Sequence, residues 1–190
     1  MRAVFLDRDG VINADRADYV KSIDELRVFE FAPKAIRRLN DAGWAVLVVS
    51  NQQGIAKGIV SESDLMSIER EIVKRVEEAG GGIAGFYYCR HPASDNCSCR
   101  KPKAGLILQA AKEHGIDLGA SVVVGDAERD IMAGKSASCK TVLVLTGKLS
   151  RHDLDRIACR PDFVADTLAE AAEFIVCTTF PPYQGGIKGG

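Results

Sequence analysis

The sequence predicts an α/β domain in which a parallel β-sheet lies between two layers of helices. Short apolar stretches rich in β-branched residues alternate with longer stretches of helical periodicity along the 190 residues. Residues 46–49 (VLVV) and 122–124 (VVV) are apolar throughout, which is typical of strands buried on both faces of a sheet. A chain of this length can bury a core large enough to be stable without disulfide bonds.

The expected strands are short apolar runs, and the expected helices fill the intervals between them. We expect strands at residues 3–6, 44–49, 82–88, 121–124, 141–145 and 163–165. We expect helices at residues 33–42, 64–79, 104–114, 128–136 and 168–176. Pro33 suits a first helical turn, and Ser61 with Asp64 three residues later resembles a capping box. Glycines stand just after three of the expected helices: Gly43, Gly80 and Gly115.

A single domain accounts for residues 1–176, because they contain neither an internal repeat nor a linker that would divide them. Residues 177–190 are rich in glycine and proline. Pro181, Pro182 and the glycines after position 184 exclude regular structure there. We expect this tail to be a surface arm or a flexible end, with contact at an interface as the alternative.

The charge balance and the apolar runs exclude several kinds of partner. The 25 basic and 26 acidic residues give a formal net charge of -1, whereas a nucleic-acid-binding surface needs a basic excess. The longest apolar runs have about a third of the length of a bilayer span. The first ten residues lack the apolar region and cleavage site of a secretory signal. We therefore expect a cytoplasmic monomer that binds neither nucleic acid nor a membrane.

Polar residues follow four consecutive expected strands. In open parallel sheets, sites form beyond the carboxyl ends of the strands. The residues at these ends are Asp7 and Asp9, Ser50 and Asn51, Cys89 and His91, and Gly125 and Asp126. Such a succession is rare by chance, so we expect one site at this edge of the sheet.

Acidic residues predict a cation site there. Asp7 and Asp9 in FLDRDGVIN stand at i and i+2 and point to one side of the strand end. One such residue alone could serve as a turn or cap, but two close carboxylates repel and need a cation or a shared proton. Asp126 arrives on a neighbouring strand end, with Asp130 one helical turn later. This set of oxygen ligands is suited to Mg²⁺ with room left for water and a phosphate.

Neutral and basic donors complete a phosphate site. Ser50 and Asn51 offer a hydroxyl and an amide that suit phosphoryl oxygens, although a simple turn would also use them. The stretch RKPK supplies Arg100 and Lys101, which either form a solvated charge run or bring cations to a phosphate. Together these parts predict phosphoryl transfer: one carboxylate attacks phosphorus, a second moves the proton, and Mg²⁺ with lysine neutralises the developing charge.

Four metal-ligating residues form the pattern C-x-H-x₅-C-x-C: Cys89, His91, Cys97 and Cys99. Three thiolates and an imidazole make the closed tetrahedral ligand set of structural zinc. We expect Zn²⁺ to fix a loop at residues 89–99 and thereby hold the following Arg100 and Lys101 over the site. The other three cysteines, which stand alone, are expected to be small buried hydrophobes: Cys139, Cys159 and Cys177.

Four stretches, DRDGVIN, VVSNQ, RKPK and GDAERD, resemble in order the four motifs of the haloacid dehalogenase superfamily of phosphohydrolases. The resemblance spans nearly all of residues 2–175 and implies a three-layer Rossmann-like sheet without a large cap domain. It implies that Asp7 is the nucleophile that becomes an aspartyl-phosphate and that Asp9 is the general acid and then base. It implies that Mg²⁺ is held by Asp7, the backbone carbonyl of Asp9 and Asp126.

The resemblance also assigns the other site residues. It implies that Ser50 and Asn51 bind phosphoryl oxygens, that Lys101 stabilises the charge on phosphorus, and that Arg100 contacts substrate. Asp130 is implied to support Lys101 or the metal shell.

The zinc loop narrows the resemblance to a branch that hydrolyses a small phosphorylated substrate. We expect removal of the 7-phosphate of a heptose 1,7-bisphosphate, because Tyr19-Val20 and SNQQGIAKG resemble the members that act on this sugar. Ala104 and Ala127 depart from those members, and histidinol phosphate or another small phosphomonoester is the alternative substrate. A zinc-stabilised binding module without catalysis is a third hypothesis, which the presence of both Asp7 and Asp9 disfavours.

Overall fold

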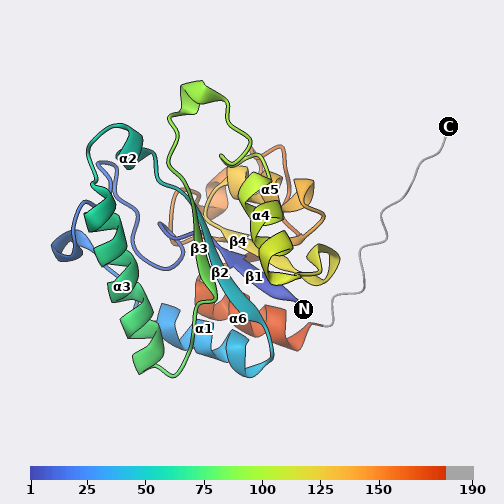
Figure 1. The fold of residues 1–190 in the computed structure, drawn as a ribbon. Coiled ribbons are helices and arrows are strands. Elements are labelled where there is room, and N and C mark those ends of the chain that lie inside the picture. Colours follow the sequence, from blue (N-terminus) through green and yellow to red (C-terminus); the bar gives the residue numbers. More distant parts are fainter. Residues whose placement is uncertain (179–190) are drawn as a thin grey trace.

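A six-stranded parallel sheet forms the centre of the computed structural model, which describes residues 1–178 (Figure 1). The strands are β1 (Ala3–Leu6), β2 (Ala45–Asn51), β3 (Gly85–Cys89), β4 (Val122–Gly125), β5 (Lys140–Val144) and β6 (Phe163–Ala165). Their order across the sheet is β3-β2-β1-β4-β5-β6, with every neighbouring pair parallel. The predicted three-layer α/β fold is therefore confirmed.

Helices cover both faces of this sheet (Figure 1). The long helices are α1 (Ala32–Asp41), α3 (Glu62–Glu78), α4 (Gly105–His114), α5 (Glu128–Ser136) and α6 (Leu168–Cys177), and α2 (Gln53–Ala56) is a single turn. Short 3-10 turns lie at Ile23–Glu25, Ala93–Asp95, Leu118–Ala120 and Arg151–Asp153. Within residues 1–178, no helix combines the length and apolar character that crossing a bilayer requires.

Alternate residues of β1 belong to two separate cores. Val4 and Leu6 pack in one cluster with apolar side chains of α1, α3 and α6. Ala3 and Phe5 pack in the other with side chains of α4 and α5. All four are fully buried. This alternation follows from the two-residue period of a strand, and it explains why the whole strand reads as apolar.

The order of the strands places the site. β1 lies between β2 and β4: the chain first runs outward from β1 through β2 to β3, and then crosses back to β4 on the other side of β1. Asp7 N donates to Val124 O (3.0 Å), which ties the residue after β1 to the end of β4. Such a switch point opens a crevice at the carboxyl ends of the strands, where ligands bind in this architecture.

Most helix ends match their signals in the sequence. Ser61 Oγ accepts from Asp64 N at the start of α3, and Pro33 lies in the first turn of α1. Gly43, Gly80 and Gly115 all have positive φ just after a helix, as predicted.

Three details differ from expectation. β2 ends two residues later than expected and β3 one residue later, because Asn51 pairs in register with Cys89, and β3 begins only at Gly85. Helix α6 runs on to Cys177, whose side chain is exposed, and Cys159 is only half-buried, so the prediction of three buried lone cysteines holds for Cys139 alone. Most of the predicted tail, from residue 179 onward, lies outside the described residues.

Candidate active site

A cavity of about 240 Å³ opens at the carboxyl ends of β1 and β2. Its lining includes five residues that the sequence singled out: Asp7, Asp9, Ser50, Asn51 and Arg100. Three further predicted residues are almost fully buried: Lys101, Asp126 and Asp130. The four motifs, which are far apart in the sequence, therefore meet at one edge of the sheet.

A buried lysine joins two of the carboxylates. Lys101 Nζ lies 3.0 Å from Asp7 Oδ2 and 2.7 Å from Asp130 Oδ1, and it donates to Val49 O at 2.8 Å. Lys101 and Asp7 are each 3% exposed. Asp130 Oδ2 also accepts from Ala127 N, which anchors the carboxylate at the start of α5. Asp130 thus holds the ammonium group of Lys101 beside Asp7.

The charge state of Asp7 suits a nucleophile. Burial by itself would raise the pKa of Asp7, but Lys101, Arg129 and a hydrogen bond from Ser50 together lower it below the ordinary value. Burial would likewise lower the pKa of Lys101, whereas Asp130 and Asp7 raise it. Asp7 is therefore a carboxylate and Lys101 an ammonium ion at neutral pH.

Asp126 has the environment of a cation ligand. Burial and the nearby carboxylates of Asp7 and Asp130 raise the pKa of Asp126 to about 7. Its Oδ1 atom is buried and has no hydrogen-bond partner among residues 1–178, while Oδ2 accepts from Lys148 N at 2.9 Å. Oxygens of Asp7, Asp126 and Asp130 all lie within 4.8 Å of one another.

Two glycines allow the backbone to pack closely against the Asp126 carboxylate. A Cβ atom added at Gly10 or at Gly147 would overlap the Asp126 carboxylate. The converging carboxylate oxygens and the unpartnered Oδ1 atom fit a hard divalent cation such as Mg²⁺.

The raised pKa of Asp126 predicts a pH-dependent affinity for Mg²⁺. Binding requires the carboxylate, so a proton must leave below pH 7. We expect the dissociation constant for Mg²⁺ to fall about tenfold for each pH unit gained below about pH 7, and to level off above it. Calorimetric titration of the metal-free protein at several pH values measures this. A constant affinity through this range would contradict the assignment of Asp126 as a ligand.

Asp9 is held by donors from three residues. Nε and Nη2 of the fully buried Arg8 donate to its carboxylate at 2.9–3.1 Å. Asn13 Nδ2 and Gln52 Nε2 each donate to Asp9 at 2.9 Å. The Asp9 carboxylate lines the cavity but lies outside the cluster of Asp7, Asp126 and Asp130. Its orientation is therefore fixed by protein donors.

Asn51 connects the second and third motifs. Its Oδ1 accepts from Lys101 N and its Nδ2 donates to Lys101 O, both at 3.1 Å. The amide thus orients the backbone of Lys101, and one amide hydrogen remains for a phosphoryl oxygen. Ser50 Oγ accepts from Gln52 Nε2 at 3.2 Å. These bonds fix the end of β2 against the loop that carries the lysine.

The rim of the cavity is formed by two loops that pack together. Tyr19, in the loop after β1, has a φ of 68° and lies against Gly54 of α2, where any Cβ atom would be within 3.3 Å of its ring. Lys57 Nζ donates to the Tyr19 hydroxyl at 2.9 Å. This contact closes one side of the cavity without a separate cap domain.

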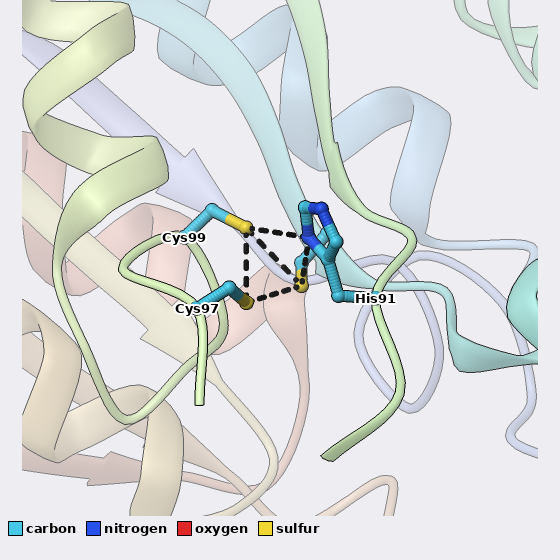
Figure 2. A group of neighbouring side chains, drawn as sticks. His91, Cys97 and Cys99 are labelled. Carbon is cyan, nitrogen blue, oxygen red and sulfur yellow. Dashed lines mark hydrogen bonds between the residues drawn. The ribbon is translucent and has the colours of Figure 1, made fainter. Parts of the chain in front are cut away.

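The four predicted zinc ligands lie close together, and Figure 2 shows His91, Cys97 and Cys99 of this group facing one another. The Sγ atoms of Cys89, Cys97 and Cys99 lie 3.3, 3.4 and 3.6 Å from one another. His91 Nδ1 lies 3.2 Å from Cys99 Sγ and 3.8 Å from Cys89 Sγ. A tetrahedral zinc ion with Zn–S bonds of about 2.3 Å separates its sulfurs by about 3.8 Å. The donor set and its spacing fit zinc.

The thiols need a cation if more than one is to ionise. Burial would raise the pKa of Cys97, but hydrogen bonds from Cys99, Cys89 and the backbone lower it to about 7. Burial and the thiols of Cys97 and Cys89 raise the pKa of Cys99 to about 12. Without a metal, ionisation of one thiol makes ionisation of the next thiol less favourable. A bound cation removes this repulsion, as expected of a metal-ligand set.

The zinc loop leads directly into the cavity. Arg100 follows Cys99 and reaches Gln53 Oε1 (3.3 Å) and His91 O (3.5 Å). Gly105 lies so close to the carbonyl of Ser98 that a Cβ atom there would overlap it, which fixes the loop against the start of α4. The ligands therefore position Arg100 and, through the backbone, Lys101.

Removal of the zinc ligands is expected to weaken substrate binding before it unfolds the sheet. In the double variant Cys97→Ser, Cys99→Ser we expect loss of bound zinc and a rise in KM of about 10- to 100-fold, because the loop no longer holds Arg100 in place. Metal analysis and steady-state kinetics measure both effects. Cys159→Ser with Cys177→Ser changes two thiols outside the loop and is the control. Zinc-free wild-type protein and an unchanged KM in the double variant would show that the loop needs no metal.

Sequence reasoning missed several residues of the cavity. Arg8 and Gln52 hold Asp9, and Arg129 and Lys148 line the same cavity. A signal existed for two of them: Arg129 stands one helical turn after Asp126 in GDAERD, and Lys148 follows the end of β5. Lys148 lies in the loop after β5, at the same edge of the sheet as the ends of the first four strands.

Known proteins resemble this chain in sequence and in fold. A family model described as HAD-hydrolase-like matches residues 98–171. The D-glycero-beta-D-manno-heptose-1,7-bisphosphate 7-phosphatase of Pseudomonas aeruginosa is 42% identical over 145 residues, covering 76% of this chain and 82% of the relative. The phosphatase of the same name from Neisseria meningitidis is 38% identical over 182 residues, covering 93% and 95%.

A solved structure agrees in fold. The D,D-heptose 1,7-bisphosphate phosphatase of B. bronchiseptica, complexed with magnesium and phosphate, has a TM-score of 0.87 and 35% identity, covering 93% of this chain and 98% of its own. The match covers 82% or more of each of these relatives, and the four motifs meet in one site. The chain therefore belongs to the haloacid dehalogenase superfamily of phosphatases, in the family of the heptose 1,7-bisphosphate 7-phosphatases.

Proposed function

We propose that this protein removes the 7-phosphate of D-glycero-D-manno-heptose 1,7-bisphosphate and leaves heptose 1-phosphate, by a Mg²⁺-dependent reaction through an aspartyl-phosphate on Asp7. The observation that carries the chemistry is the buried, ionised Asp7 carboxylate with the Lys101 ammonium 3.0 Å away at the base of a cavity. The names of the relatives support the substrate.

The first half of the reaction transfers the phosphoryl group to the protein. An Asp7 carboxylate oxygen attacks phosphorus, and the bond between phosphorus and the sugar oxygen breaks. Asp9 gives its proton to the leaving oxygen. Lys101, together with Ser50 and Asn51, stabilises the charge on the phosphoryl oxygens.

The second half releases phosphate. Asp9, now a carboxylate, takes a proton from a water molecule whose oxygen attacks phosphorus, and the bond from phosphorus to Asp7 breaks. Both halves need Asp9 at one position, which agrees with the donors from Arg8, Asn13 and Gln52. Mg²⁺, held by Asp7, the backbone carbonyl of Asp9 and Asp126, would neutralise charge on the phosphoryl oxygens.

The charges at the rim support a substrate with a second phosphate. Arg100 lines the cavity and contacts only the neutral oxygens of Gln53 and His91. Arg16 and Lys148 at the same rim are paired with Asp18 and Asp15 respectively. Among Arg16, Arg100 and Lys148, Arg100 is thus the cation without an acidic partner, and it is available for a distal anion of the substrate.

Parallel measurement of kcat/KM on both anomers of heptose 1,7-bisphosphate and on histidinol phosphate tests the proposal. We expect one heptose anomer to be preferred over histidinol phosphate by at least about tenfold, because Arg100 has a second phosphate to bind only in the bisphosphate. Preference for histidinol phosphate would overturn the substrate and leave the mechanism in place. Absence of hydrolysis with all three in the presence of Mg²⁺ would favour a binding module.

We also infer that the protein is a cytoplasmic monomer. Cell fractionation would test its location, and sedimentation would test its oligomeric state.

A further inference from the structure

Arg129 differs from every other cation in the cavity. Five arginine and lysine residues line the cavity within residues 1–178: Arg8, Arg16, Arg100, Arg129 and Lys148. Four of them donate side-chain hydrogen bonds, as described above. Arg129 donates none to any described residue, and its Nε atom is buried without a partner. Burial of such a group is costly unless a ligand supplies the missing acceptor.

The position of Arg129 is next to the reacting carboxylate. Its Nη2 atom lies 3.9 Å from Asp7 Oδ2 and 4.0 Å from Asp126 Oδ1, which is too long for a hydrogen bond to either. The side chain is 36% exposed, so it reaches from the start of α5 into the open part of the cavity. The guanidinium therefore stands near Asp7 with its donors unused.

Both carboxylates already have other partners. Asp7 accepts from Arg8 N at 2.7 Å and lies beside Lys101 Nζ at 3.0 Å. Asp126 accepts from Lys148 N through one oxygen, and the other oxygen faces the proposed cation site. Neither needs Arg129 as a hydrogen-bond donor. The guanidinium is therefore available to donate hydrogen bonds to a third group that carries negative charge and several oxygens.

We propose that Arg129 is a direct ligand of the transferring phosphoryl group, to whose oxygens its guanidinium donates when phosphorus lies over Asp7. This inference rests on the proposed phosphoryl transfer at Asp7. Arginine presents parallel N–H donors that match phosphoryl oxygens, and it stays charged throughout the reaction. Lys101 acts on the same group as a point charge from the buried side. The two cations therefore contact the phosphoryl group in different ways.

Inorganic phosphate is a suitable probe because it binds without turnover. We expect Arg129→Met to weaken Mg²⁺-dependent phosphate binding by at least about tenfold and to lower kcat/KM by about 10²- to 10³-fold for heptose bisphosphate and for 4-nitrophenyl phosphate alike. Arg129→Lys should show a smaller loss than Arg129→Met but a clear one, because an ammonium group lacks the parallel N–H donors of a guanidinium. Arg70→Met, the same change on the exposed face of α3, is the matched control.

Mg²⁺ affinity separates this role from a structural one. Removal of a positive charge 4.0 Å from Asp126 should leave Mg²⁺ binding unchanged or tighter in Arg129→Met. Unchanged phosphate affinity, or equal weakening of Mg²⁺ and phosphate binding, would overturn the proposal. If wild-type protein with Mg²⁺ neither binds phosphate nor hydrolyses a phosphomonoester, the proposed function fails instead. A wild type that hydrolyses and an Arg129→Met variant that matches it refute the role of Arg129 alone.

Discussion

Asp7→Asn is expected to reduce phosphate release on the order of 10⁴-fold or more, because an amide cannot form the aspartyl-phosphate on which both halves of the proposed reaction depend. The variant should stay folded. Asp7 lies close to Asp126 and Asp130, so the change also removes repulsion among buried carboxylates, and the amide is nearly the same size. Release of inorganic phosphate in the presence of Mg²⁺ and the melting temperature measure the two effects.

The matched control for Asp7→Asn is Asp155→Asn, which makes the same chemical change at a side chain that is 97% exposed. We expect it to leave kcat unchanged. Intact phosphate release by Asp7→Asn with Mg²⁺ present would mean that the nucleophile, and with it the whole mechanism, is wrongly assigned.

Lys101→Met is expected to affect both activity and stability. The ammonium group is buried with Asp7 and Asp130, and its loss leaves two carboxylates without their cation. Breaking a buried ion pair costs about 3–5 kcal/mol of the free energy of unfolding. The missing charge at the phosphoryl oxygens should lower kcat by about 10²- to 10³-fold. Denaturant unfolding and steady-state kinetics measure the two losses.

The stability loss in Lys101→Met should grow as pH rises. Without the lysine, burial and mutual repulsion raise the pKa values of the remaining carboxylates above their unfolded values, so the folded state retains protons that the unfolded state has lost. Stability then falls as pH rises through the folded-state pKa values. Lys112→Met on the exposed side of α4 is the control, for which we expect no change. Equal stability of Lys101→Met and Lys112→Met would contradict the buried ion-pair network.

The sheet and the centre of the site could be predicted because each depends on local patterns. Strands buried on both faces are apolar throughout, and the carboxyl ends of parallel strands share one edge. These two rules are enough to predict that Asp7, Ser50 and Asp126, from three distant stretches of sequence, lie close together. The predicted zinc ligands were equally visible, since Cys89 at the end of β3 and Cys99 are only ten positions apart.

Contacts between loops could not be predicted in the same way. The position of Tyr19 against Gly54, with positive φ, depends on how two irregular segments meet. Gly147 and Gly10 carry no chemistry, yet both leave space for the Asp126 carboxylate. In the sequence, Arg8 has the appearance of a surface charge, but the structure buries it with its guanidinium donating to Asp9, the next residue. Such features depend on tertiary packing that no local pattern encodes.

The error at Cys177 has a simple physical cause. A helical pattern gives the period of a helix but not the residue at which packing ends, and helix ends are uncertain by one or two residues. The last turn of α6 extends beyond the core that buries Ile175, so the thiol at its end is exposed.

Capture of the phosphorylated protein tests the central claim most directly. Wild-type protein mixed with Mg²⁺ and heptose 1,7-bisphosphate and quenched in acid within one turnover should yield, on peptide mass analysis, a peptide that contains Asp7 and carries one added phosphoryl group. The Asp7→Asn protein, treated in the same way, should yield none. Release of phosphate at the full rate by the wild type, with the phosphoryl group absent from Asp7 at every quench time, would contradict the account.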